Sequence, residues 1–271
     1  MIAIVRSELR KVVSTKVWWI LLFVLMGYVG LTQALLVWTV AHSAALETGT
    51  GQAMPMPTGA DAARMIYATG ASFGYVFPAI IGALIVTNEY RYLTITPTFL
   101  AEPHRGRVLA GKCVAALPFA ALTGVAITVT SLIFGAGVLA LLGKPTALNE
   151  AATWEFFARC TVAMTLWGLV GVGLGALVKN QVAAIVGLLG FTQFLEPILR
   201  MLPMFNGNNY PVLNYLPGAV GDAVSGMSLY SFMSQSPADP LAFGWAVLVL
   251  AGYAALFCVV GYFATLRRDV S

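Results

Sequence analysis

Long apolar stretches that are nearly free of charge dominate the sequence and set what the chain can fold into. About 20 apolar residues in a helix cross the roughly 30 Å hydrocarbon core of a bilayer. We predict six membrane-spanning helices, at residues 17–41, 65–87, 113–142, 156–178, 182–199 and 241–266. Six spans and their connections fill 271 residues, which leaves no room for a second, soluble domain. The expected fold is one all-α transmembrane domain over residues 1–271.

Composition supports this prediction. The chain is 59% hydrophobic and 10% charged, whereas soluble domains are about 45–50% apolar and about 25% charged. The net charge of +4 gives no support to nucleic-acid binding, because in a membrane protein the position of the charges matters more than their sum. Cys113, Cys160 and Cys258 are far apart and lack C-x-x-C spacing, so we expect isolated thiols and neither a disulfide nor a metal site.

Residues 1–16 predict an amphipathic helix on the membrane surface. Its apolar stripe contains Ile2, Val5, Leu9, Val12 and Val13, and its polar stripe contains Arg6, Glu8, Arg10 and Lys11. The following apolar stretch is too long for a signal peptide, whose apolar region runs about 7–15 residues.

Basic residues predict the orientation in the membrane. With six spans, 11 Lys and Arg residues fall on one side and 4 on the other. The positive-inside rule makes the first side cytoplasmic, so both termini are expected in the cytoplasm.

Two connections differ in character. Residues 179–181 are so short that the fourth and fifth spans should form a tight hairpin. Residues 201–240 contain several prolines, the turn Asn206-Gly207 and no lysine or arginine. We expect an extracellular loop there that holds short helices and partly re-enters the membrane.

A few residues inside the spans have more than one interpretation. Glu196 could form an ion pair with Arg200, at helical spacing near the outer end of the fifth span, or belong to a substrate path. The G-x-x-x-G pairs Gly70–Gly74 and Gly171–Gly175 fit packing within one bundle or a subunit interface equally well.

No phosphate-binding loop is predicted in this chain. Residues 137–145 superficially resemble G-x-x-x-x-G-K-[ST], but the glycine spacing is one residue too long and Pro145 occupies the hydroxyl position. No nucleophile-base set or metal-ligand pair has usable spacing either, so we do not expect an enzyme.

The connection at residues 87–112 is long and mixes apolar and basic groups around a short helix. A loop of this kind suggests docking of a cytoplasmic partner. The alternative is an interfacial helix that binds anionic lipid.

The segments SELRKVVSTKVWW and NEYRYLTITPTFLAEPHRGRVLAGK resemble the permease subunits of type-2 ATP-binding-cassette (ABC) exporters, particularly the actinobacterial drug-resistance and bacitracin-resistance kind. The resemblance implies a coupling helix after the second span that docks on a separate cytoplasmic ATPase. It also implies two permeases, identical or related, with two ATPases that hold ATP and magnesium. No cofactor is then expected in this chain.

The resemblance assigns residues to the ATPase contact. Glu89, Tyr90 and Arg91 match the opening of the motif, Pro103 its helix-starting proline, and Arg105, Gly106, Arg107 and Lys112 its basic end. Asn88 departs from the pattern, in which glycine is common before the acidic residue.

The resemblance also places a translocation path between two permease copies, along the second and fifth spans. Our candidate path residues are Phe73, Phe77, Phe191, Gln193, Phe194 and Glu196. An aromatic wall with few polar groups suits an amphipathic or hydrophobic cargo, such as a drug, a peptide antibiotic or a lipid-like molecule. The expected location is a bacterial plasma membrane, with lipids as further partners.

Two other functions stay open. An ion-driven secondary transporter should show charged groups at midplane or interrupted helices in paired halves, and the sequence shows neither clearly. A non-transporting anchor or regulatory module would bind an ATPase without ATP-dependent flux.

Overall fold

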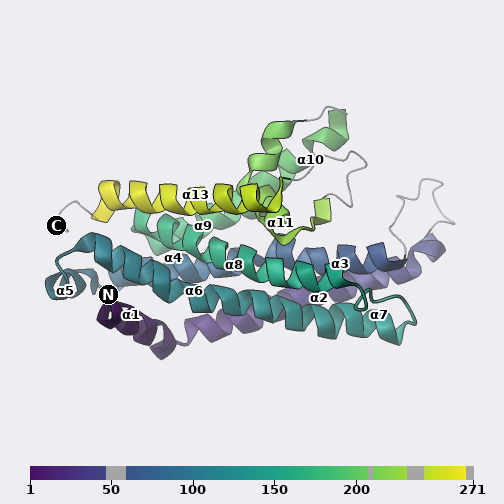
Figure 1. Cartoon of the computed structure of the whole chain (residues 1–271), viewed down its shortest axis with the longest axis horizontal. Helices are drawn as coiled ribbons and strands as arrows, with labels where there is room; N and C mark the ends of the chain where they lie inside the picture. Colours follow the sequence, from purple (N-terminus) through teal and green to yellow (C-terminus); the bar gives the residue numbers. More distant parts are fainter. Residues whose placement is uncertain (47–58, 207–209, 231–240, 267–271) are drawn as a thin grey trace.

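The computed structural model describes residues 1–46, 59–206, 210–230 and 241–266, and every element among them is helical (Figure 1). The α-helices are α1 (Ile2–Ser14), α2 (Val17–Leu46), α3 (Gly59–Gly74), α4 (Val76–Arg91), α5 (Ile95–Ala101), α6 (Arg105–Thr130), α7 (Gly137–Leu141), α8 (Ala151–Leu177), α9 (Gln181–Leu189), α10 (Glu196–Asn206), α11 (Pro217–Ser225) and α13 (Phe243–Gly261). Three π-helical segments are η1 (Ser131–Ala136), η2 (Gly190–Leu195) and η4 (Tyr262–Leu266), and η3 (Pro211–Tyr215) is a 3₁₀-helix.

Six of the described helical segments are long and apolar enough to cross a membrane, as the sequence predicts. They run over Val17–Ala41, Gly59–Arg91, Arg105–Leu141, Ala151–Leu177, Gln181–Pro203 and Phe243–Thr265. In places the helical segments extend beyond the predicted spans. The third segment begins at Arg105 instead of residue 113, and the second covers 59–91 instead of 65–87. Hydropathy predicts only the apolar part of a helix. Backbone hydrogen bonds also form between polar residues, so a helix can extend beyond that part.

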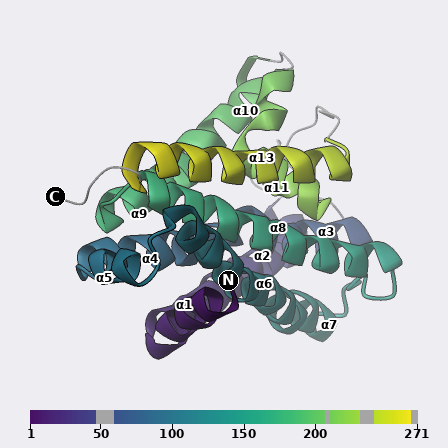
Figure 2. The same cartoon turned by 60° about the vertical axis from the view of Figure 1, so that its left-hand side comes forward.

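Helix α8 lies at the centre of the bundle, between α13 on one side and α6 on the other (Figures 1 and 2). It also packs along α4, where glycines let the two backbones touch. A Cβ atom on Gly171 would lie 2.0 Å from the carbonyl oxygen of Ala79, and one on Gly82 would lie 2.1 Å from that of Gly168. Small residues permit such an approach between membrane helices.

The two G-x-x-x-G pairs therefore serve packing within one chain. Gly175 of α8 faces the backbone of Ala83 in α4. Gly70 and Gly74 of α3 both face Ile127 of α6, with 2.7 Å from each added Cβ to the nearest isoleucine atom.

Several spans are interrupted. A turn at Tyr75 separates α3 from α4, η1 interrupts the third span, and η2 interrupts the fifth. A π-helical turn inserts one extra residue and redirects the side chains that follow it. The apolar pattern did not indicate these interruptions, because an inserted residue changes the direction of the side chains that follow it without changing the composition of the segment.

The connection after the fifth span folds into short helices. Helix α10 projects from the bundle, whereas α11 lies beside α13 (Figures 1 and 2). Helix α11 is buried, from Gly218 to Ser225 with few exceptions, and contacts α8 as well. Asn206 ends α10, and its expected turn partner Gly207 lies outside the described residues.

The short connection between α8 and α9 is as predicted. Helix α8 ends at Leu177 and α9 begins at Gln181. The Asn180 side chain caps α9 by accepting hydrogen bonds from the backbone N–H groups of Val182 (2.9 Å) and Ala183 (3.1 Å).

The expectation of three isolated cysteines was wrong for two of them. All three thiols are free, but the sulfur atoms of Cys113 in α6 and Cys258 in α13 lie 3.9 Å apart. Sequence spacing could not show this contact, because 145 positions separate the two residues.

One end of the bundle gathers α1, α5 and the end of α13, while α7 lies at the opposite end (Figure 1). The first helix, the loop at residues 87–112 and the last helix thus meet at one end of the molecule. The candidate site lies here.

Candidate functional site

Helix α1 packs on α6, and Leu9 and Val12 of its predicted apolar stripe are partly buried against the bundle. A Cβ atom on Gly111 of α6 would lie 2.6 Å from Ile4, so the two helices are in close contact. Glu8 is only 2% exposed, whereas Ile2 and Val13, predicted on the apolar stripe, are 87% and 59% exposed. The predicted polar stripe is therefore wrong at Glu8, because opposite charges on neighbouring helices draw its carboxylate inward, whereas the exposed Ile2 and Val13 are compatible with an apolar stripe that faces lipid.

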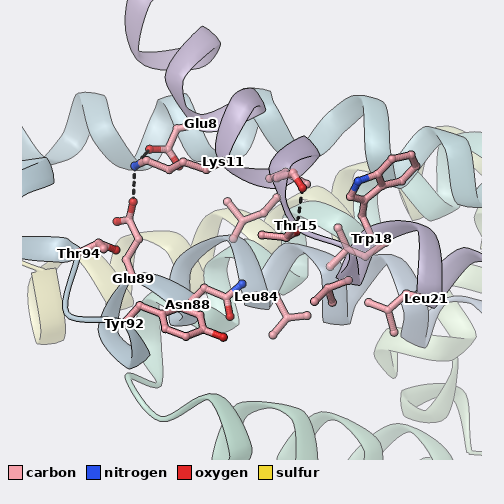
Figure 3. Close-up of a pocket in the computed structure, with 14 residues that line it drawn as sticks. Glu8, Lys11, Thr15, Trp18, Leu21, Leu84, Asn88, Glu89, Tyr92 and Thr94 are labelled. Carbon is pink, nitrogen blue, oxygen red and sulfur yellow. Dashed lines mark hydrogen bonds and ion pairs between the residues drawn. The ribbon is translucent and has the colours of Figure 1, made fainter.

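Glu8 belongs to a cluster of four charged side chains, which we call the charge cluster: Glu8, Lys11, Glu89 and Lys112. The ammonium of Lys112 lies 2.7 Å from Glu8 Oε2 and 2.9 Å from Glu89 Oε1. That of Lys11 lies 2.6 Å from Glu8 Oε1 and 2.5 Å from Glu89 Oε1 (Figure 3). The formal charges sum to zero, so the cluster joins α1, α4 and α6 without a net charge.

The two lysines differ in exposure. The side chain of Lys112 is 3% exposed, and it also donates to the backbone carbonyl of Ile85 (3.3 Å). Lys11 is 41% exposed. Burial acts to lower the pKa of Lys11, but its hydrogen bonds to Glu8 and Glu89 outweigh burial and raise the pKa above its ordinary value. Lys11 is therefore cationic at neutral pH.

The same cluster holds the loop that leads into α5. The Thr98 hydroxyl donates to Glu89 Oε1 (3.3 Å), and the Thr94 N–H donates to the Glu89 carbonyl (2.9 Å). Ile95 is 2% exposed, and the Arg105 guanidinium lies 4.9 Å from the centre of the Phe99 ring. Helix α5 is thus fixed at both ends to the rest of the bundle.

Leu93 reverses the chain between α4 and α5 in a left-handed conformation (φ 58°). Glycine or asparagine usually ends a helix in this way. A branched residue in this region costs on the order of 1–2 kcal/mol, and such strain persists only where the surroundings impose it.

Around this turn, apolar side chains face outward. Tyr92, Leu93 and Leu100 are 64%, 81% and 79% exposed. Arg91 at the end of α4 and Arg107 in the first turn of α6 are also exposed. We call these five residues the loop surface. An exposed apolar group with a basic rim is typical of an interaction site.

The residues that resemblance assigned to ATPase coupling therefore occupy two layers. Glu89 and Lys112 are buried in the charge cluster. Tyr90 is half-buried, and the centre of its ring lies 5.9 Å from the Lys179 ammonium. The Arg91 guanidinium donates to Gln181 Oε1 (3.0 Å). Pro103, Gly106 and Arg107 are exposed, and Arg105 is half-buried. Pro103 lies in the short link after α5 and two residues before α6, which begins at Arg105.

Sequence reasoning missed Glu8 and Lys11 as members of this site. The available signal was that four charged residues lie in apolar surroundings near the ends of three helices. Nothing in the sequence indicates which of them pair, because Glu8 and Lys112 are 104 positions apart.

The candidate path residues fall into separate groups. The Tyr28 ring of α2 lies 6.4 Å from that of Phe73 and 6.2 Å from that of Phe77. Phe191 and Gln193 in η2 are half-buried, and Phe194 is 69% exposed. Within the described residues, no aromatic contact joins the phenylalanines of η2 to Phe73 and Phe77.

One interpretation of the sequence paired Glu196 with Arg200, but no ion pair joins these two side chains among the described residues. Arg200 donates to Asp222 of α11 (2.6 Å) and lies 4.0 Å from the Tyr230 ring centre. Glu196 is 1% exposed and accepts a hydrogen bond from the Ala219 N–H (2.9 Å). Both residues thus hold α11, which sequence spacing within one helix could not show.

No group of three or more metal-ligating side chains is found in the described part of the chain. With six helices long and apolar enough to cross a bilayer, the architecture is that of a multi-pass membrane protein. Comparison with protein-family models gives no match, and a search of the curated proteins gives none either.

Proposed function

We propose that this chain is the membrane-spanning permease subunit of an ABC exporter. One observation carries the proposal: the connection from α4 through α5 to α6 presents the exposed apolar and basic loop surface, while the ion pairs of the charge cluster fix its base to α1, α4 and α6. A partner that pushes on such a helix moves the bundle, because a rigid contact transmits displacement where a flexible loop would absorb it.

The proposed division of labour follows from the two layers. The loop surface contacts a cytoplasmic ATPase, and the charge cluster passes the movement to three helices. ATP and magnesium are bound by the ATPase. Two permease copies, identical or related, and two ATPases make up the transporter. The membrane is a bacterial plasma membrane, with α1, α5 and both termini on the cytoplasmic side.

The cargo in this proposal is amphipathic or hydrophobic and passes between the two permease copies. The exposure of Phe194 supports its assignment to that boundary, because its side chain is 69% exposed within a segment long enough to span the membrane. Phe73 and Phe77 are assigned to the same path through their position in the second span.

Ion-driven transport is a second candidate, favoured by one set of contacts. Glu196 and Asp222 are buried, Arg200 pairs with Asp222, and η2 interrupts the helix directly before Glu196. Ionisable groups beside a broken helix occur at ion sites of secondary transporters. Transport that continues without ATP but stops when the ion gradient is dissipated would favour this candidate.

One introduced charge and one reversed charge on the loop surface, with one matched control, test the proposed ATPase contact. We expect Leu100→Asp and Arg107→Glu each to abolish co-purification of the ATPase, with membrane insertion and elution volume unchanged. Lys144→Glu is the control, since Lys144 is an exposed basic residue in the link between α7 and α8, away from α5 (Figure 1). Undiminished ATPase recovery with both loop-surface variants would refute the docking assignment.

A further inference from the structure

A cavity of about 350 Å³ lies next to the charge cluster, between α1, the start of α2 and the last turns of α4 (Figure 3). Its volume is at the lower end of the range for small-molecule sites, which is about 300–1,000 Å³. None of the proposed coupling steps needs an empty space here.

Most of the cavity wall is hydrocarbon. Leu21 and Trp18 of α2 face Ile81, Leu84 and Ile85 of α4 across it. The Trp18 ring is held in place by Phe119 of α6, with 5.7 Å between ring centres. Such a wall suits an alkyl chain.

One end of the cavity is polar. The Asn88 carboxamide points into it between Leu84 and Glu89 (Figure 3), and no hydrogen-bond partner for this side chain exists among the described residues. Glu89 is 4% exposed, and its Oε2 atom also lacks a donor within that part of the chain. A buried acceptor without a partner, such as Glu89 Oε2, is uncommon in folded proteins and marks a place that a ligand can satisfy. Asn88 is half-buried and offers a further hydrogen-bonding group beside it.

The charge cluster limits what this polar end can accept. Its two carboxylates and two ammonium groups already pair with one another. A ligand with a net charge would bring an ion without a counter-ion into a largely apolar site, which is strongly unfavourable. A hydroxyl or amide carries the donor and acceptor that Asn88 and Glu89 lack, without adding charge.

We propose that this cavity binds a single-chain, uncharged amphiphile. The alkyl chain lies along Leu21 and Leu84, and the hydroxyl or amide head bonds to the Asn88 carboxamide and donates to Glu89 Oε2. Because Glu89 also holds α1 and the α5 loop, the bound molecule stabilises the base of that loop. This inference does not require the chain to be a transporter.

Photo-labelling of the purified full-length protein in nanodiscs tests the proposal. The probes are a monoacylglycerol with a diazirine in its chain, the fatty acid with the same chain and the alkylammonium with the same chain. Mass spectrometry locates the label. We expect the monoacylglycerol to label peptides that contain Trp18 or Leu84 about tenfold more than either charged probe does, the ratio expected for one uncompensated charge at a partly solvated site.

Two variants address the two ends of the cavity. Leu84→Trp fills the apolar part and should remove the label, whereas Leu248→Trp, at a 63%-exposed position of α13, should not. Asn88→Ala should reduce the label about fivefold, the effect of one lost hydrogen bond. Asn88→Asp adds a negative charge and should move the preference to the alkylammonium.

The Asn88 variants decide the matter if Leu84→Trp fails to fold. Equal labelling by all three probes would overturn the proposal. So would labelling that neither Leu84→Trp nor Asn88→Ala reduces in protein with an unchanged elution volume.

Discussion

Lys112 is a cation with 3% of its side chain exposed, beside two carboxylates that are about as deeply buried. Moving a charge out of water is costly, and the cost is recovered only while every partner is present. The charge cluster therefore depends on each member, and removal of one charged side chain should destabilise the packing of α1, α4 and α6 together.

Lys112→Met tests this dependence. Removing one partner of a buried pair costs on the order of 3–5 kcal/mol, because the remaining charge is left uncompensated. We expect a clear fall in Tm, measured in detergent by size-exclusion survival after heating. The double variant Lys112→Met with Glu8→Gln should recover part of the loss. Glu155→Gln is the control, since Glu155 is 57% exposed beside Arg159 and surface pairs contribute little. Equal Tm values for Lys112→Met and the control would contradict the structural role of the cluster.

At the scale of the helices, the sequence predicted the number of spans and the all-helical fold better than it predicted which side of each helix faces which neighbour. Runs of apolar residues identify the spans because hydrocarbon burial depends on composition along the chain. They could not predict which glycines face which helix, since Gly171 meets Ala79 only after both helices pack. The same limit applies to the candidate site: the resemblance assigned Glu89 and Arg107 to one motif, whereas the pairing of Glu89 with Lys11 arises from tertiary packing.

Helix packing makes Gly171 sensitive to substitution. Any side chain there would collide with the backbone of α4, because a Cβ atom would lie 2.0 Å from the Ala79 oxygen. Gly171→Val should cost about 1–3 kcal/mol or prevent folding, seen as loss of monodisperse protein on size exclusion. Gly187→Val is the matched control, since nothing lies within 4 Å of a Cβ atom on Gly187. A well-folded Gly171→Val protein would mean that α4 and α8 are further apart than described.

The contact between α6 and α13 can be trapped. The sulfur atoms of Cys113 and Cys258 are 3.9 Å apart, so a small rotation brings them to bonding distance. We expect copper-phenanthroline to link them within one chain, with a loss of two hydrogen atoms detected by intact mass and a cross-linked peptide after digestion. Cys258→Ser should abolish the link and Cys160→Ser should not. Failure of the wild-type chain to link would contradict this helix contact.

The whole molecule has two different ends. One gathers α1, α5 and the end of α13, and the other contains α7 and the start of α3 (Figure 1). The excess of basic residues near the first end makes it cytoplasmic in the proposed orientation.

Single cysteines at the two ends report this orientation. Leu93→Cys and Lys144→Cys both place a thiol at an exposed loop position. With a membrane-impermeant maleimide, we expect Lys144→Cys to label in intact cells and Leu93→Cys to label only in inverted vesicles. The reverse pattern would place α5 outside the cell, where no ATP-hydrolysing partner could reach it. The native thiols give the background, which is measured in the unsubstituted protein.

The most direct test of the central claim is to isolate the tagged, full-length protein from its own cells in mild detergent and quantify what co-purifies. The account predicts an ABC-type ATPase in a one-to-one ratio with this chain, and ATP hydrolysis by the isolated complex. Recovery of the intact, folded chain with no such ATPase would contradict the proposal that α5 couples this bundle to ATP hydrolysis.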